Sequence, residues 1–280
     1  MGYFNPADLF ARNTESSQSS RNPYSNELDI VYLAMPSSSD IGSYSVSSVS
    51  APLSHELTHS VTYNQKTFSH ILQGNTERER ESLILDEGLS HLSESLCGFG
   101  VSGGNTAFVS VYLQDTACYS LSGPNALGQE DSIGARGGML LFLSWLYRKS
   151  ENGNLFIKNM LNSNTFGWDV IGEAMGATTG KLFVQFAQDM ALTYRDGASF
   201  SSSIDSVTKE PIHIFCNMGD FQFDGKSHSV GFPNIYTSIS LLPSHSLALL
   251  EEVTLPPGGC FVADSSLENE GFLVGLLQLD

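Results

Sequence analysis

Residues 46–62 of the chain read VSSVSAPLSHELTHSVT. Apolar side chains recur in this stretch every three or four positions, which is the period of an α-helix. Proline is tolerated in the first turn of a helix or at a kink, so Pro52 must occupy one of these two places. The spacing therefore predicts a helix from about Val46 to Thr62, with its apolar positions at Val46, Val49, Leu53, Leu57 and Val61.

An H-E-x-x-H motif, formed by His55, Glu56 and His59, lies inside this expected helix. Two histidines four positions apart lie on one face, so both imidazoles can bind a single Zn²⁺ at about 2.0–2.1 Å. Glu56 then lies beside the metal, where its carboxylate can take a proton from an attacking water. The motif predicts a catalytic zinc site, and the plain alternative is two ordinary histidines on a helix surface.

A catalytic zinc needs a third protein ligand, and Glu87 is the candidate. We expect a second helix from about Thr76 to Leu96, with Asn75 as its N-cap. Glu87 lies there in an apolar frame, where an unpaired carboxylate would be costly. Antiparallel packing of the two helices can bring it against the histidine pair. His91, one turn further along the same face, is the alternative ligand, whereas His70 fits no ligand spacing.

The second helix contains residues 85–94, LDEGLSHLSE, after a long connection from the first motif. With these two motifs the chain resembles the gluzincin metallopeptidases and is most similar to the hyicolysin family. The resemblance spans residues 1 to about 195. It implies a zinc endopeptidase with one Zn²⁺ per chain, in a bacterial protein that is secreted or held at the cell envelope. The ligands and base that it implies are His55, His59 and Glu87 for the metal and Glu56 for the proton transfer.

The second motif departs from the thermolysin-like pattern. His91 stands where those enzymes have an aspartate that supports a zinc-bound histidine. Asp86 or Glu94 is expected to supply that support, and His91 belongs to the same outer set. Gluzincins also use a tyrosine or histidine to stabilise the oxyanion of the tetrahedral intermediate, and no motif fixes that residue here. The candidates are Tyr112, Tyr119 and Tyr147.

The remaining sequence predicts an α+β fold. The run from Leu28 to Met35 has the β-branched and aromatic content of a strand. After Tyr194, short apolar runs alternate with turn signals such as Asp224-Gly225, as in a small β-sandwich. We expect a catalytic domain at residues 1–200 and a β-rich domain at residues 201–280. Further helices are expected at 132–148, 155–161, 168–175 and 181–194.

Composition excludes several classes of protein. The 280 residues include 13 Lys and Arg against 30 Asp and Glu, giving a formal charge of −17, which repels nucleic acid. No apolar run approaches the roughly 20 residues of a membrane span. Nucleotide-binding and G-x-S-x-G motifs are absent from the sequence. Charged residues are only 15%, as is common on secreted surfaces, although no signal peptide follows Met1.

The sequence decides neither the pairing of the cysteines nor whether the protein depends on calcium. The chain has four cysteines and no C-x-x-C pair, so neither a zinc ribbon nor a thioredoxin motif is present. Four cysteines allow three disulfide pairings, and reduced buried thiols are equally compatible with the sequence. No EF-hand loop indicates calcium binding. The cysteines are Cys97, Cys118, Cys216 and Cys260.

A polypeptide substrate is the expected partner, and the oligomeric state is open. The alternative from another class is a catalytically silent, zinc-containing binding protein whose acidic β module contacts a partner. Glu56 argues against that alternative, because structural zinc sites are usually closed and need no base. A third option is hydrolysis of a different amide or an ester by the same chemistry.

Overall fold

The computed structural model describes most of the chain up to residue 196 and five short strands beyond it. Within these residues the protein is mostly helical and carries a small two-stranded sheet, which confirms the α+β class. None of the described helices has the length and hydropathy that a bilayer crossing requires. The described ranges are 2–14, 21–34, 46–74, 79–100, 103–125 and 127–196, with strands at 215–216, 220–223, 226–229, 235–236 and 249–250.

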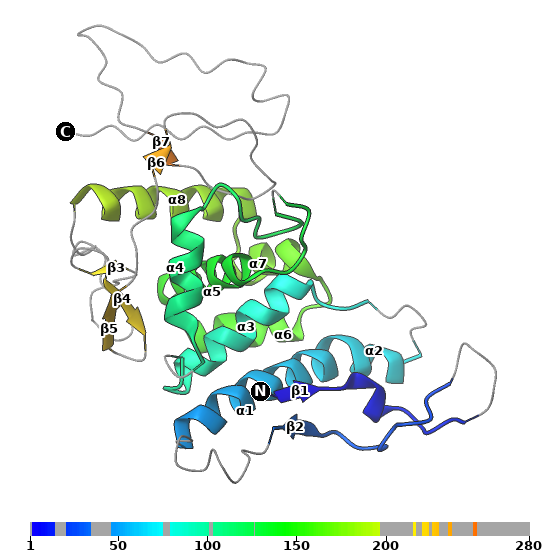
Figure 1. Ribbon diagram of the computed structural model, residues 1–280. Helices are drawn as coiled ribbons and strands as arrows, with labels where there is room; N and C mark the ends of the chain where they lie inside the picture. The colour runs from blue at the N-terminus through cyan, green and yellow to red at the C-terminus, as the bar shows by residue number, and fades with distance from the viewer. Residues whose placement is uncertain are drawn as a thin grey trace, which may run out of the picture.

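The H-E-x-x-H motif lies in α1 (Val46–Tyr63), which continues through a π-helical turn, η2 (Asn64–Phe68), into α2 (Ser69–Leu72) (Figure 1). The antiparallel strands β1 (Gly2–Phe4) and β2 (Val31–Leu33) both contact α1. The predicted strand from Leu28 to Met35 is thus present in a shorter form. A short 3-10 helix, η1 (Pro6–Leu9), follows β1.

The polarity of α1 is inverted relative to an ordinary amphipathic helix. Its apolar side chains Leu53, Leu57 and Val61 are 38%, 47% and 46% exposed, whereas the charged Glu56 is only 8% exposed. Amphipathic helices normally bury their apolar stripe. Here the polar face is the one turned inward, toward the helix and the strands that pack on α1. Pro52 lies inside the helix, beyond its first turn, and contributes no N–H to its hydrogen bonds.

Helix α3 (Leu83–Leu96) contacts both α1 and α5 (Ile133–Lys149). The prediction that this helix starts near Thr76 is wrong, because residues 79–82 precede it in a non-helical conformation; Asn75, the predicted cap, lies outside the described residues. Ser82 has extended backbone and caps the helix, its Oγ accepting a hydrogen bond from the Leu85 N–H at 3.3 Å. The carboxylate of Glu81, just before the cap, forms a buried ion pair with Lys66. This pair ties the start of α3 to η2.

The core centres on α5, whose side chains are buried along most of its length. Helix α4 (Asn105–Gln114), which the sequence did not predict, packs closely against it. A Cβ added to Gly137 would lie 2.0 Å from the Phe108 carbonyl oxygen, so only glycine permits this approach. The expected core side chains are confirmed as members of this cluster or packed against it: Met139, Phe142, Trp145, Phe183 and Phe186.

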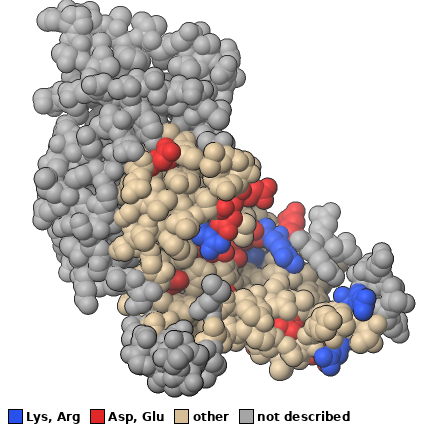
Figure 2. Space-filling view, viewed as in Figure 1, with Lys and Arg blue, Asp and Glu red and all other residues tan. Residues whose placement is uncertain are grey.

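Three further helices complete this part of the molecule, each in contact with the next: α6 (Gly153–Asn162), α7 (Gly167–Met175) and α8 (Thr179–Asp196). Their positions, and that of α5, confirm the four predicted helices to within a few residues. Figure 2 shows acidic and basic side chains close together near the centre of the visible face, while broad areas carry neither kind. The low charged fraction of the sequence is therefore visible on this surface.

Beyond residue 200 the described strands are short. β3 (Phe215–Cys216), β4 (Asp220–Phe223) and β5 (Lys226–Ser229) form an antiparallel sheet, and β6 (Ile235–Tyr236) pairs in parallel with β7 (Leu249–Leu250). Strands are thus present in the region where the sequence predicts them. The expected domain boundary near residue 200 lies outside the described residues, and the β-sandwich stays a prediction.

Candidate metal centre

Helices α1 and α3 bring together three side chains that could hold a metal ion. One ligand atom from each of His55, His59 and Glu87 lies within 4.8 Å of the other two. His55 Nε2 is 3.3 Å from Glu87 Oε2, and His59 Nε2 is 3.8 Å from Glu87 Oε1. Ligands of a tetrahedral zinc ion, each about 2.0–2.1 Å from it, stand about 3.4 Å apart. The observed spacing therefore fits one ion between the three residues.

The Nδ1 atom of each histidine lies at hydrogen-bond distance from a carboxylate oxygen. His59 Nδ1 lies 2.8 Å from Asp86 Oδ2, and His55 Nδ1 lies 2.8 Å from Glu94 Oε1. A neutral ring that donates its Nδ1–H in this way keeps a lone pair at Nε2, which is the form that binds metal. The sequence left Asp86 and Glu94 as alternatives for one supporting role. In the structure each carboxylate contacts one histidine, Asp86 contacting His59 and Glu94 contacting His55.

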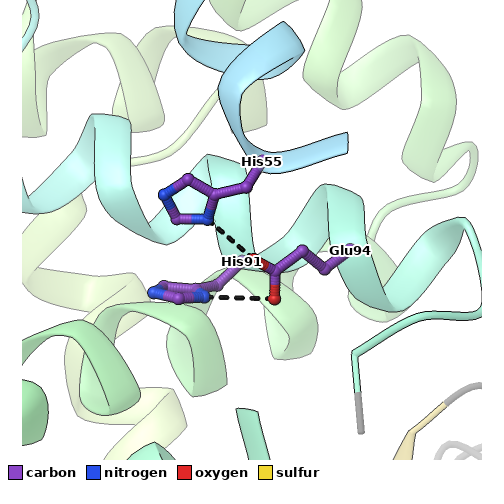
Figure 3. A group of neighbouring side chains, drawn as sticks. All are labelled: His55, His91 and Glu94. Atoms are coloured by element: carbon purple, nitrogen blue, oxygen red, sulfur yellow. Dashed lines mark hydrogen bonds and ion pairs between the residues drawn. The ribbon is translucent and has the colours of Figure 1, made fainter. Parts of the chain in front are cut away.

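His91 occupies a different place from Glu87, although both lie on α3. Its Nδ1 is 3.3 Å from Glu94 Oε2, and its ring stands edge-on to Phe108 with the centroids 4.8 Å apart. It belongs with His55 and Glu94 to a second group with metal-ligand spacing (Figure 3). The structure thus groups Glu87, and not His91, with the two histidines of the motif.

Arg136, on α5, touches the centre although the sequence did not indicate it. Its Nη1 donates to Glu87 Oε2 at 2.7 Å, and its Nε and Nη2 donate to Asp131 at 2.7 and 2.5 Å. The hydrogen bond with Asp131, followed by the negative charges of Glu87 and Glu56, raises the pKa of Arg136. The sequence feature that could have indicated Arg136 is its position in the first turns of an otherwise apolar helix, five residues after Asp131.

Hydrogen bonds and charges within the cluster shift the pKa values of its members. Burial lowers the pKa of His55, but hydrogen bonds to Glu87 and Glu94 outweigh it and raise that pKa to about 9. Burial likewise opposes the effect of Asp86 on His59, whose pKa is nevertheless raised. Burial raises the pKa of Glu87, but the His55 hydrogen bond and the Arg136 charge outweigh it and lower that pKa. Hydrogen bonds and opposite charges within the cluster therefore outweigh the effect of burial on the pKa of all three residues.

After removal of bound metal with a chelator, we expect the free energy of unfolding to depend on the protonation of His55. The fold raises the pKa of His55 from its ordinary value of 6.5 to about 9, so the contribution of this residue to stability is complete below pH 6.5 and is lost as the pH rises through 9. Urea unfolding from pH 6 to 10 should show a loss on the order of 2–3 kcal/mol. The His55→Gln variant should lack this loss, and an equal loss in both proteins would contradict the assignment.

Glu56 follows His55 on α1 and is buried against the strand β1. A Cβ added to Gly2 would lie 2.8 Å from Glu56 Cγ, so the β1 backbone passes directly over this side chain. The Glu56 carboxylate makes no hydrogen bond to another residue in the described part of the chain. It lies close enough to Arg136 for their charges to interact. This carboxylate can therefore exchange a proton without first breaking a described hydrogen bond.

The three candidate oxyanion donors lie in different places. Tyr112 is fully buried in the core. Tyr147 donates its hydroxyl hydrogen to an α6 side chain at 2.9 Å, and it lies about 16 Å further along the α5 axis than Arg136. Tyr119 packs against Gly134 in the first turn of α5, the end of the helix that carries Arg136. Tyr112 packs against Gly138 one turn further along the same helix, so both Tyr112 and Tyr119 lie nearer than Tyr147 to the end of α5 that carries Arg136.

Among the described residues, His70, Cys97 and Cys118 belong to neither group with metal-ligand spacing. His70 Nε2 is 3.1 Å from Asn164 Oδ1 in the connection between α6 and α7. Cys97 is a free thiol, and Cys118 lies in the turn that follows α4. The other two cysteine side chains lie outside the described part of the chain. Comparison with known protein families and with curated proteins finds no match.

Proposed function

We propose that this protein is a zinc-dependent endopeptidase of the gluzincin type. The observation that carries the proposal is the convergence of His55, His59 and Glu87 at the spacing of zinc ligands, with a carboxylate behind each histidine. Two imidazole nitrogens and one carboxylate oxygen form the His₂Glu ligand set of catalytic zinc sites, which leaves a fourth position for water or substrate. This donor chemistry supports zinc rather than calcium or magnesium, which prefer oxygen ligands.

When bound, zinc supplies Lewis acidity that activates water and polarises the substrate carbonyl. Glu56 accepts the proton that the attacking water loses and then gives it to the amine nitrogen as the carbon–nitrogen bond breaks. Asp86 and Glu94 keep the two histidine rings oriented and their Nε2 lone pairs available. Arg136 holds the Glu87 carboxylate through Oε2 and balances part of the negative charge around the centre.

The second candidate function is a silent binding protein that keeps zinc as a structural element. Structural zinc sites usually have four protein ligands, whereas this group has three and a free carboxylate beside it. The endopeptidase therefore fits the donor set better. Hydrolysis of another amide or an ester would use the same residues. With the endopeptidase we also propose a gluzincin-like catalytic domain at residues 1–200, export from a bacterial cell and a polypeptide substrate.

Metal analysis of the purified protein tests the proposal. We expect about one zinc per chain in the wild type and in Glu130→Gln, which changes an exposed carboxylate outside the centre. Glu87→Ala should lower zinc affinity more than about 100-fold, because even supporting residues are worth 10- to 100-fold. The zinc-loaded wild type should release new amino termini from a mixed peptide library. A wild type that binds no zinc after reconstitution would overturn the proposal.

A further inference from the structure

The carboxylate of Glu94 lies between two imidazole rings (Figure 3). Its Oε1 is 2.8 Å from His55 Nδ1, and its Oε2 is 3.3 Å from His91 Nδ1. Glu94 and His91 are each only 3% exposed, so bulk water does not compete for these contacts. The contacts thus run inward from the His55 ring through the Glu94 carboxylate to the buried His91 ring.

Two interpretations of this group are chemically distinct. A second metal ion would be bound by His55 Nδ1, while the first group already uses His55 Nε2. One imidazole that binds two ions must lose both ring protons, whereas a hydrogen-bonded ring keeps one. Because His55 Nδ1 and Glu94 Oε1 are at hydrogen-bond distance, the chain of hydrogen bonds needs no such loss.

We propose that His91 and Glu94 are positioning residues, which hold His55 with Nε2 toward a single metal ion. The proposal rests on the proposed zinc centre and adds an inner layer to it. Glu94 accepts the His55 Nδ1–H at one oxygen and the His91 Nδ1–H at the other. His91 therefore fixes the direction of the carboxylate, and the carboxylate fixes the direction of the metal-binding ring.

The far side of His91 supports a positioning role. Its Nε2 is buried and has no hydrogen-bond partner among the described residues. A buried polar atom without a partner is unfavourable, and an apolar ring would fill the same space beside Phe108 without that penalty. The gain that offsets the penalty is the Nδ1–H donated to Glu94.

Gly103, in the segment that follows α3, lies directly against the Glu94 carboxylate. A Cβ added to Gly103 would lie 2.0 Å from Glu94 Oε2, so any larger residue would displace the carboxylate. Gly103 is not among the glycines with positive φ, so alanine is compatible with its backbone. Gly103→Ala therefore moves Glu94 without altering a titratable residue. Gly123→Ala is its matched control, because an added Cβ there meets nothing closer than 4.0 Å.

The experiment measures zinc affinity by competition with a chelator, zinc stoichiometry, and the visible spectrum of the Co²⁺-substituted protein. We expect one zinc per chain throughout, and affinity lowered about 10- to 100-fold in His91→Phe and Gly103→Ala, with an altered Co²⁺ spectrum. Gly123→Ala should match the wild type. His91→Asn should recover most of the affinity, because its amide N–H can replace the Nδ1–H. Circular dichroism establishes that each variant is folded.

Three outcomes would overturn the proposal. A second zinc in the wild type that disappears in His91→Phe would make this group a metal site. Unchanged zinc affinity in both His91→Phe and Gly103→Ala would show that these residues only fill space in the core. A wild type that binds no zinc would remove the centre itself. A wild type that binds one zinc with the expected variant losses, yet cleaves no peptide, would instead refute the endopeptidase and leave the positioning role intact.

Discussion

Glu56→Gln should bind zinc as tightly as the wild type and lose peptidase activity by about 10²- to 10⁴-fold, the range of general acid–base catalysis. Glutamine has the same shape as glutamate but cannot accept the proton of the attacking water. Glu56 has no described hydrogen bond, so its neutral replacement should leave the packing of α1 against β1 unchanged. The loss should therefore appear in kcat rather than in metal content.

The measurement is kcat/KM on a fluorogenic peptide, together with zinc content for each protein. Glu130→Gln is the control, because it makes the same chemical change on an exposed residue outside the centre. If Glu56→Gln kept a full complement of zinc and activity close to the wild type, Glu56 would not be the base. The proposed mechanism would then have to be abandoned.

Lys66→Met should destabilise the fold by about 3–5 kcal/mol, the usual cost of leaving a buried charge without its partner. Lys66 Nζ lies 2.6 Å from Glu81 Oε2, and both side chains are almost completely buried. Lys66 also donates to the Thr165 carbonyl at 2.7 Å, while Glu81 accepts from the Gly167 N–H at 2.5 Å. The pair joins the π-helical turn after α1 to the start of α3 and to α7.

Urea unfolding measures this effect against Lys149→Met. Lys149 is 3.7 Å from Asp189 with a much more exposed side chain, so its loss should cost less than about 1 kcal/mol. The double variant Lys66→Met/Glu81→Gln should recover part of the stability, because it leaves no unpaired charge. A loss in Lys66→Met as small as that in Lys149→Met would show that the buried pair contributes little.

The local features of this protein follow from its sequence. Helical periodicity places His55 and His59 on one face of α1 whatever surrounds that helix, because residues four apart always lie one turn apart. The same rule gave α5 to α8 to within a few residues. The apolar positions around Glu87 predict from the sequence that its carboxylate has a cationic or metal neighbour, since a buried carboxylate without one is costly.

Only the tertiary structure decided which distant groups meet. Periodicity could not exclude His91 in favour of Glu87, assign Glu94 to His55 and Asp86 to His59, or bring Arg136 from α5 to the centre. The apolar stripe that predicts α1 is its exposed side, because the polar side is the one that meets α3 and β1. Helical geometry fixes directions over four or five residues, whereas these contacts depend on how whole helices pack together.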